Sequence, residues 1–270
     1  MKQSFENGNV ILELNDDFDV GLCLDCGQAF RWKQDENGEW KGVAFSKKLR
    51  IGQQGHTVTF FDTTPEDFEK IWYSYFDFQR NYREIIKKYD DKSLQTACLA
   101  YPGIRILKQD EWETICSFII SANNNIPRIK GIIERLCENF GEDLGGEYSF
   151  PSARKLSELT VEDLAPLRAG FRAKYIIDAA QKISSGEVDI EKVKQMPFSQ
   201  AKDELMKIKG VGEKVAQCAL LYGFGRVEAF PVDVWVKRII SELYPDGLPQ
   251  CIEGTQGIAQ QYLFHWRRNI

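Results

Sequence analysis

The residues best suited to chemistry flank a glycine turn in the stretch LMKIKGVGEKVAQCALLYGFGRVEAFPVDV, which runs from Leu205 to Val234. Gly210 and Gly212 predict a tight turn between two helices, because glycines let the backbone bend sharply and approach a ligand closely. The second helix would begin near Glu213 with unpaired N–H groups and a positive dipole end, which suits a phosphate. A plain helical hairpin packed in a core gives the same pattern, so the turn alone indicates no function.

Lys214 and Asp233 are the candidate catalytic pair. Lys214 falls in the first turn of the second helix, where the helix dipole disfavours a cation. Solvated lysines are common at such positions, but partial burial would favour the neutral amine, which is a nucleophile. Asp233 precedes another predicted helix and is expected to be its N-cap. The same carboxylate could stabilise positive charge that develops on a sugar ring.

The overall charge argues mildly against a nucleic acid partner, since proteins that bind phosphates usually have a basic surface. The formal net charge is −5 at pH 7. Residues 1–100 carry 13 basic and 17 acidic side chains, and the other 170 residues carry 22 and 23. Local basic segments remain, one within 123–136 and one at Arg267 and Arg268. A basic surface on an acidic protein is therefore compatible with the sequence.

The cysteines and histidines do not predict a metal site. The seven cysteines are scattered, with a single CxxC pair at Cys23 and Cys26, and the only histidines are His56 and His265. Structural zinc and iron–sulfur sites need denser ligand sets. An odd cysteine count without an export signal predicts free thiols. No apolar run approaches the roughly 18–20 residues of a membrane span, so no membrane association is expected.

The predicted fold class is α+β. Runs of β-branched and aromatic residues predict strands at 9–14, 39–45 and 56–61, with turns at Asn37-Gly38 and Gln54-Gly55. Thr64 followed by Pro65 predicts a helix start. Helices are predicted at 110–122, 126–139, 172–185, 199–208, 213–224, 233–243 and 255–268. We therefore expect an antiparallel β-sheet domain with helices over 1–100 and a helical body of two all-α lobes over 101–270, the hairpin occupying about 199–224.

GVGEK (210–214) followed by PVD (231–233) resembles the helix–hairpin–helix glycosylase superfamily. A lysine within the hairpin is typical of its bifunctional members, which form a Schiff base with the sugar. The resemblance implies that Lys214 is this nucleophile and Asp233 the carboxylate that assists it. It also implies that Gly210 and Gly212 bring the hairpin against DNA, and that neither a metal nor an organic cofactor is needed.

Further motifs narrow the resemblance to 8-oxoguanine DNA glycosylases of the OGG type. CGQAFRW (26–32) is similar to a motif of that family whose glycine carbonyl, here of Gly27, accepts the N7 proton that oxidised guanine carries and guanine lacks. A hydrogen bond that is favourable for one base and repulsive for the other is a sound basis for discrimination. A turn glycine followed by core aromatic residues would give the same sequence.

Two motifs are assigned to the strand opposite the lesion. SANNNIPRI (121–129) implies that Asn123 fills the space left by the flipped base and that Arg128 reads the orphaned cytosine. Consecutive asparagines also predict a helix end or turn. GFRAKY (170–175) implies that Phe171 is a wedge beside the cytosine and that Arg172 is its second reader. Phe171 replaces the usual tyrosine, which keeps the stacking face and loses a hydroxyl.

The remaining assignments concern the flipped base. IAQQYLF (258–264) implies that Gln260 bonds its Watson–Crick edge and that Phe264 stacks on its face. Gln260 and Phe264 are four residues apart and share a helix face. Cys218, four residues after Lys214, is stacked against the base in the family, although alone it would be a core residue. Pro231 of the PVD sequence is also assigned to base binding.

Two positions depart from the family pattern. Trp235 stands where the best-known relatives have a histidine that contacts a phosphate, so that contact is in doubt. Lys209 stands where proline often precedes the hairpin, which should affect rigidity more than chemistry. The motifs nevertheless occur in the correct order across residues 26–264, a combination that is hard to obtain by chance.

The resulting hypothesis is a bifunctional glycosylase that excises 8-oxoguanine from double-stranded DNA and cleaves the strand by β-elimination. We expect a monomer in the cytoplasm of a prokaryote, associated with the nucleoid, or in the nucleus of a eukaryote. One alternative is an alkylated-base glycosylase of the same superfamily, against which Lys214 and Gly27 argue. Others are a non-catalytic helix–hairpin–helix DNA-binding module and a helical scaffold with no DNA role, which leave Lys214, Asp233 and Gln260 without a reason to co-occur.

Overall fold

The computed structural model describes residues 1–269, and the chain divides into two compact units. Unit 1 comprises residues 1–42, 49–108 and 227 onward, and unit 2 comprises residues 43–48 and 109–226. The C-terminal helices therefore belong to the same unit as most of the sheet. The predicted domain division after residue 100 stays a prediction about the chain's organisation.

The N-terminal part forms one six-stranded sheet in the order β1-β2-β6-β5-β4-β3. The strands are β1 (Lys2–Glu6), β2 (Asn9–Glu13), β3 (Trp32–Gln34), β4 (Trp40–Ala44), β5 (Lys47–Gln54) and β6 (Thr57–Phe61). The paired strands are antiparallel, with Val10 opposite Phe60 between β2 and β6. The predicted strands at 9–14, 39–45 and 56–61 and the α+β fold class are confirmed.

Fourteen α-helical segments lie within residues 1–269. In unit 1 they are α1 (Val20–Asp25), α2 (Pro65–Asp67), α3 (Tyr73–Tyr75), α4 (Tyr82–Ile86), α5 (Lys92–Ala100), α13 (Val234–Leu243) and α14 (Gln256–Arg268). In unit 2 they are α6 (Glu111–Ser121), α7 (Ile126–Phe140), α8 (Ala153–Ser157), α9 (Ala173–Ser184), α10 (Ile190–Gln195), α11 (Phe198–Leu205) and α12 (Glu213–Tyr222). Short 3-10 segments occur at Ala165–Leu167, Gly170–Arg172 and Gln250–Ile252, and a π-helical segment occurs at Phe68–Trp72. All seven predicted helices after residue 100 are confirmed.

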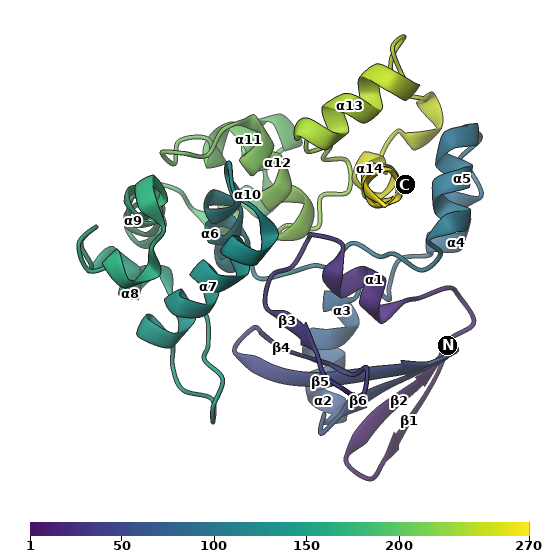
Figure 1. The fold of residues 1–270 in the computed structure, drawn as a ribbon, viewed down its shortest axis with the longest axis horizontal. Coiled ribbons are helices and arrows are strands. Elements are labelled where there is room, and N and C mark those ends of the chain that lie inside the picture. The colour runs from purple at the N-terminus through teal and green to yellow at the C-terminus, as the bar shows by residue number, and fades with distance from the viewer. Residues whose placement is uncertain (270) are drawn as a thin grey trace. The chain divides into compact units, whose positions relative to one another are not determined.

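An aromatic core fixes the sheet of unit 1 against the helical segment that follows it. Phe60 alternates inward on β6, and its ring lies 5.0 Å from that of Phe68 and 5.7 Å from that of Phe76. Figure 1 shows α2 and α3 lying across the sheet. Thr64 caps α2 by accepting a hydrogen bond from the Asp67 N–H at 3.1 Å, as predicted. Burial of such aromatic side chains supplies much of the stability of a domain core.

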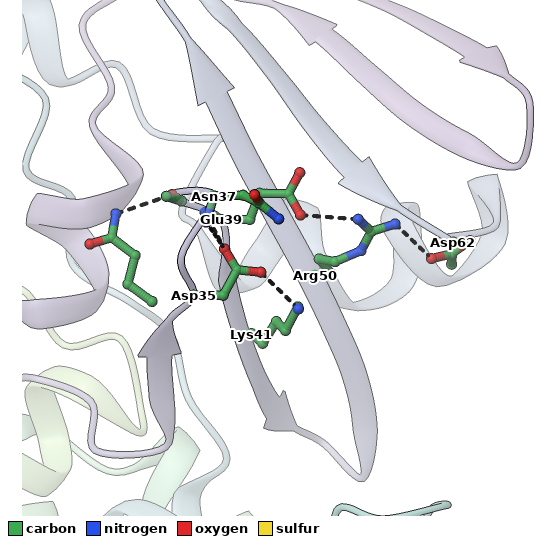
Figure 2. A network of polar contacts seen from close by, with 8 residues as sticks. Asp35, Asn37, Glu39, Lys41, Arg50 and Asp62 are labelled. Carbon is green, nitrogen blue, oxygen red and sulfur yellow. Dashed lines mark hydrogen bonds and ion pairs between the residues drawn. The ribbon is translucent and has the colours of Figure 1, made fainter.

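A polar network on the sheet, shown in Figure 2, is structural. Arg50 on β5 bridges Glu39 and Asp62 at 3.0 and 3.2 Å, and Asp35 pairs with Lys41 at 2.7 Å. The Asp35 carboxylate also accepts N–H bonds within the predicted Asn37-Gly38 turn. Exposed pairs of this kind contribute little to stability, so their main effect is to fix the hairpin conformation.

Unit 2 is built around α6, in which eight of eleven residues are buried. Its C-terminal end therefore provides a fixed platform for the loop that joins it to α7. All seven cysteines of the chain are free thiols, as predicted. No helix within residues 1–269 is both long and apolar enough to cross a membrane.

Candidate functional site

The helical hairpin of unit 2 forms as predicted, from α11, a turn at 206–212 and α12. Gly210 has φ +85°, a left-handed conformation that favours glycine, and a Cβ atom there would lie 2.4 Å from the Tyr175 ring. Gly212 is the N-cap of α12 with no side-chain cap, and a Cβ there would meet no atom within 4 Å. The hairpin thus needs glycine at 210 for its conformation, while the start of α12 is exposed and available to an anion.

Gly210→Ala is therefore expected to destabilise the protein, because it combines left-handed backbone strain with a clash against an aromatic ring. Strain and overpacking together should cost about 2–4 kcal/mol, which corresponds to a fall in Tm of several degrees. Gly212→Ala is the matched control and should cost less than about 1 kcal/mol. Thermal denaturation of both variants checks this, and an equal effect of the two would contradict the assignment of strain to Gly210.

Lys214 lies in the first turn of α12, as predicted, with a half-buried side chain. Its Nζ atom is 3.4 Å from the Ser121 hydroxyl and 5.2 Å from the centre of the Phe118 ring. Within unit 2, no carboxylate lies within 4.0 Å of this nitrogen, so no ion pair there occupies the amine. The side chain is thus held by weak contacts, and no ion pair within unit 2 fixes it in place.

Ser121 and Phe118 were not among the predicted site residues. The Ser121 hydroxyl donates to the Phe118 carbonyl at 2.8 Å, which leaves its oxygen able to accept a bond from Lys214. Phe118 stacks on Tyr222 at 5.3 Å, with the ring planes 15° apart. Cys218, one helical turn after Lys214, is 3% exposed. Ser121 is the first residue of the SANNNIPRI motif, so its place in that motif was the available signal.

The loop between α6 and α7 presents Asn123 to solvent, and the first turn of α7 presents Arg128. Asn123 has φ +49° and is exposed, and its side chain makes no hydrogen bond within residues 109–226. Asn124 donates to the Ile120 carbonyl at 3.0 Å, and Asn125 caps α7 by accepting the Arg128 N–H at 3.0 Å. The three asparagines therefore differ in role: two of them fix the loop, and Asn123 is free to contact a ligand.

Phe171 and Arg172 lie in the 3-10 segment directly before α9. Phe171 is 49% exposed, which suits the predicted wedge. Arg172 is only 2% exposed, and its guanidinium donates to the carbonyls of Ala122 and Asn123. Burial, and secondarily the charge of Arg128, lower the pKa of Arg172. The structure thus brings Asn123, Arg128, Phe171 and Arg172 to one region of unit 2.

A groove of about 530 Å³ lies between α9 and the hairpin turn of unit 2. Its lining includes Lys174, Tyr175, Asp178, Lys209 and Gly210. Asp178 accepts the Lys209 N–H at 2.7 Å and thereby fixes the turn before Gly210. The groove places the exposed ammonium groups of Lys174 and Lys209 beside the exposed glycine turn. Such a surface is suited to a nucleic acid backbone, whose phosphates are negatively charged.

In unit 1, Gly27 occupies a turn after α1 with φ +88°. The next residue, Gln28, is fully buried and donates to the Cys23 and Arg105 carbonyls at 2.9 and 2.8 Å. Burial also raises the pKa of Cys26 to about 12, so this CxxC thiol is protonated at neutral pH. Gln28, which was not predicted, fixes the turn that holds Gly27.

Helix α14 of unit 1 brings Gln260 close to the same turn. Gln261, another unpredicted residue, donates to the Cys26 carbonyl at 3.1 Å and so joins α14 to the residue before Gly27. Gln260 is 5% exposed, and its Oε1 atom is buried without a hydrogen-bond partner in the described chain. Phe264 is half-buried, with Arg268 5.9 Å from its ring centre. An unpaired buried amide oxygen is costly in a folded protein and typical of a functional site.

Asp233 caps α13 in unit 1, as predicted, by accepting the Val236 N–H at 2.8 Å. Pro231 is buried, whereas Trp235 in the first turn of α13 is 42% exposed. The Arg238 guanidinium lies 5.3 Å from the centre of the Trp235 ring. An aromatic face and a cation therefore lie together at the start of α13. Among residues 1–269, no group of three or more His, Cys, Asp or Glu side chains is arranged to hold a metal ion.

Two family models together match most of the chain. Residues 10–115 match the N-terminal domain of 8-oxoguanine DNA glycosylase. Residues 116–248 match the HhH-GPD superfamily of base excision DNA repair proteins. The two matched segments contain all the predicted site residues except Gln260 and Phe264.

Individual proteins show the same similarity. An N-glycosylase/DNA lyase of Saccharomyces cerevisiae is 34% identical over 257 residues, covering 82% of this chain and 67% of the yeast protein. The structure of MBOgg1 with a low-affinity DNA ligand is 41% identical with a TM-score of 0.93, covering 99% of this chain and 98% of that one. The Clostridium acetobutylicum 8-oxoguanine glycosylase/lyase, bound to double-stranded DNA with cytosine opposite 8-oxoguanine, is 38% identical with a TM-score of 0.93, covering 100% and 98%.

Proposed function

The chain belongs to the 8-oxoguanine DNA glycosylase family, and from this premise we propose how its residues carry out base excision. The enzyme excises 8-oxoguanine from double-stranded DNA and then cleaves the strand at the abasic site. The observation that carries this proposal is the half-buried Lys214 amine on the first turn of the second hairpin helix, with only a hydroxyl as polar partner in its unit.

The first chemical step is displacement of the base by Lys214. Its neutral Nζ attacks C1′, the C–N bond to the enzyme forms, and the N-glycosidic bond breaks with its electron pair leaving on the base. Positive charge develops on the sugar as the base departs, and the Asp233 carboxylate stabilises it. Capping and catalysis are compatible, because Val236 occupies only one of the two carboxylate oxygens.

Strand cleavage follows from the covalent intermediate. Loss of a proton from the nitrogen and opening of the sugar ring give an imine between Lys214 and C1′. The imine makes the C2′ protons acidic, so removal of one proton expels the 3′ phosphate by β-elimination. Hydrolysis of the imine by water then releases the sugar fragment and restores the Lys214 amine.

Base recognition is assigned to unit 1. The Gly27 carbonyl accepts the N7 proton of 8-oxoguanine, and Gln28 and Gln261 hold the turn that presents it. Gln260 bonds the Watson–Crick edge with its otherwise unpaired amide oxygen, and Phe264 stacks on the base. Pro231 adds apolar contact with the base, and the predicted contact of Cys218 with the base stays a prediction. Guanine would place an acceptor against the Gly27 carbonyl and be rejected.

DNA binding is assigned mainly to unit 2. The N–H groups at Gly212 and the start of α12 bind a phosphate, and the phosphate chain follows the groove past Lys174 and Lys209. Phe171 inserts beside the orphaned cytosine, Asn123 occupies the vacated space, and Arg128 bonds the cytosine edge. The predicted contact of Arg172 with the cytosine stays a prediction. The proposed enzyme is a monomer. It is located in the cytoplasm of a prokaryote or in the nucleus of a eukaryote, because its substrate is genomic DNA.

Arg128→Ala is expected to reduce the preference for cytosine opposite the lesion by about tenfold, because a bidentate guanidinium contact discriminates between bases by about 1–3 kcal/mol. Single-turnover excision of 8-oxoguanine opposite each of the four bases measures the preference. Arg154→Ala is the matched control, since Arg154 is an arginine of the same unit with an 87% exposed side chain. If the unmutated enzyme is equally active opposite all four bases, Arg128 does not select for cytosine.

A substrate panel tests the proposed function as a whole. The enzyme is expected to release base from duplexes that contain 8-oxoguanine opposite cytosine and to leave guanine and 3-methyladenine in place. Release of 3-methyladenine in preference to 8-oxoguanine would instead indicate an alkylated-base glycosylase. Binding without release of any base would indicate a DNA-binding module.

A further inference from the structure

A carboxylate lies on the surface of unit 2 to which the phosphate chain is assigned. Asp178 lines the groove between α9 and the hairpin turn, together with Lys174 and Lys209. A carboxylate repels nearby phosphates, so it weakens the binding of DNA unless it makes another contribution. The contacts of Asp178 within unit 2 indicate what that contribution is.

The Asp178 carboxylate is held between a lysine and the backbone of the hairpin turn. Its Oδ2 atom accepts the Lys209 N–H at 2.7 Å and lies 3.3 Å from the Lys182 ammonium. Lys182 also donates to the Lys207 carbonyl at 2.5 Å. The side chains of Asp178 and Lys182 are only 13% and 18% exposed. A largely buried ion pair on α9 therefore bonds one N–H and one carbonyl of the turn.

The Lys209 N–H has no acceptor within the turn itself. The Val211 N–H donates to the Ile208 carbonyl at 3.0 Å and closes a four-residue turn. Gly210, the third residue of this turn, has φ +85°, which is typical of a type II β-turn. Only the last residue of such a turn donates within it, so the N–H of Lys209, the second residue, needs another acceptor. Asp178 supplies it.

Tyr175 supports the same turn from the same face of α9. Tyr175, Asp178 and Lys182 are spaced three and four residues apart, so they share one helix face. A Cβ atom on Gly210 would lie 2.4 Å from the Tyr175 ring, so the ring lies directly against the Gly210 backbone. These three side chains thus contact the turn at residues 207, 209 and 210.

The turn leads directly into the proposed phosphate site. Gly212 follows it as the N-cap of α12 and has no side-chain cap. The direction of the N–H groups at the start of α12 therefore depends on the backbone that enters the helix. Such groups bind a phosphate well only when they are aligned with its oxygens, so the position of the turn affects the affinity for DNA.

We propose that Asp178 is a positioning residue, which bonds the Lys209 N–H and so holds the hairpin turn where the N–H groups at the start of α12 meet a DNA phosphate. This inference rests on the proposed function, which assigns the hairpin to DNA. Loss of the carboxylate should therefore weaken DNA binding, although the same change removes a negative charge from the binding surface. A purely electrostatic role would have the opposite sign.

Binding is measured on a duplex that carries a tetrahydrofuran analogue of an abasic site opposite cytosine, which has no base to be released. Asp178→Ala removes the charge and the acceptor, and its Kd should rise about tenfold, an effect of the order that a hydrogen bond to a charged group has. Asp178→Asn removes only the charge, because its amide oxygen can accept the Lys209 N–H. D178N should therefore bind at least as tightly as the unmutated enzyme.

Two further comparisons separate positioning from a general loss of structure. Single-turnover excision at saturating DNA should fall by less than about threefold in D178A, because seven of the ten residues of α12 are buried and hold Lys214 in place. Asp163→Ala is the matched control, because Asp163 also accepts a turn N–H of unit 2, from Thr160 at 2.8 Å, and does not line the groove. If D178A does not fold, Asp178→Leu replaces it, since leucine keeps the branched shape without an acceptor.

Proline at position 209 provides a rescue. Its ring restricts φ to the value that the second residue of a type II turn adopts, and it has no N–H to be paired. Lys209→Ala loses the same ammonium group but keeps the N–H. In the D178A background, K209P should therefore bind DNA several-fold more tightly than K209A.

The inference is overturned if D178A binds as tightly as the unmutated enzyme, or if D178N or D163A loses as much affinity as D178A. It is also overturned if the saturated rate of D178A falls as much as its affinity, or if K209P gives no gain over K209A in the D178A background. Release of 8-oxoguanine from a duplex with cytosine opposite is the separate test of the proposed function. If the unmutated enzyme binds the abasic duplex and releases no 8-oxoguanine, the proposed function fails, and the binding of the Asp178 variants still decides the role of Asp178.

Discussion

Lys214→Gln is expected to abolish covalent trapping by borohydride and to lower the single-turnover rate of base release by about three orders of magnitude or more. Glutamine cannot form an imine, so both glycosidic displacement by the enzyme and β-elimination lose their nucleophile. The amide is still able to bond the Ser121 hydroxyl, so α12 and the hairpin should keep their structure. Binding to the lesion-containing duplex should therefore change by less than about tenfold.

Lys92→Gln is the matched control for this variant. Lys92 is also a lysine at the start of a helix, the first residue of α5, but it is exposed and lies in unit 1 outside the predicted site. Its replacement should leave both trapping and base release unchanged. Trapping that survives in K214Q would assign the nucleophile to another amine.

Asp233→Asn is expected to lower the single-turnover rate by about 10²–10³-fold while the affinity for lesion DNA stays nearly the same. A carboxylate stabilises developing positive charge on the sugar and an amide does not, and a lost electrostatic contact of this kind costs about 3–4 kcal/mol of the barrier. Asparagine is as good an N-cap as aspartate, so the Val236 N–H keeps an acceptor and α13 should remain intact.

The control for a capping effect is Asp189→Asn. Asp189 caps α10 by accepting the Lys192 N–H at 3.1 Å, as Asp233 does for α13, and it is not among the predicted site residues. Its substitution should change neither the rate nor the Tm. An unchanged single-turnover rate in D233N would show that Asp233 caps α13 and has no role in catalysis.

Local signals in the sequence predicted those features that depend on local interactions. The caps at Thr64 and Asp233 were predictable because each side chain bonds an N–H three residues on. Strand β2, NVILE, was predictable because it is an apolar run with β-branched residues, while β1, KQSFE, contains no such run and is exposed throughout. Strand β1 exists because β2 offers it an edge to pair with, which is a tertiary cause.

The supporting residues of the site could not be predicted in the same way. Gln28 donates to the Arg105 carbonyl, 77 residues away along the chain, and Gln261 donates to the Cys26 carbonyl, 235 residues away. Neighbouring residues in the sequence therefore do not indicate that these two side chains are buried. Arg172 was recognised from its motif, but its residue type does not indicate which backbone carbonyls its guanidinium bonds. Those contacts depend on where the chain folds back, 49 and 50 residues earlier, to place Asn123 and Ala122 beside it.

The central claim is that one lysine bonds covalently to the sugar, and the most direct measurement identifies that lysine. The unmutated enzyme is trapped with borohydride on a duplex containing 8-oxoguanine opposite cytosine, digested with a protease and a nuclease, and analysed by mass spectrometry. The expected result is a single sugar-derived adduct on Lys214. An adduct on a different amine, or release of 8-oxoguanine with no adduct at all, would contradict the claim.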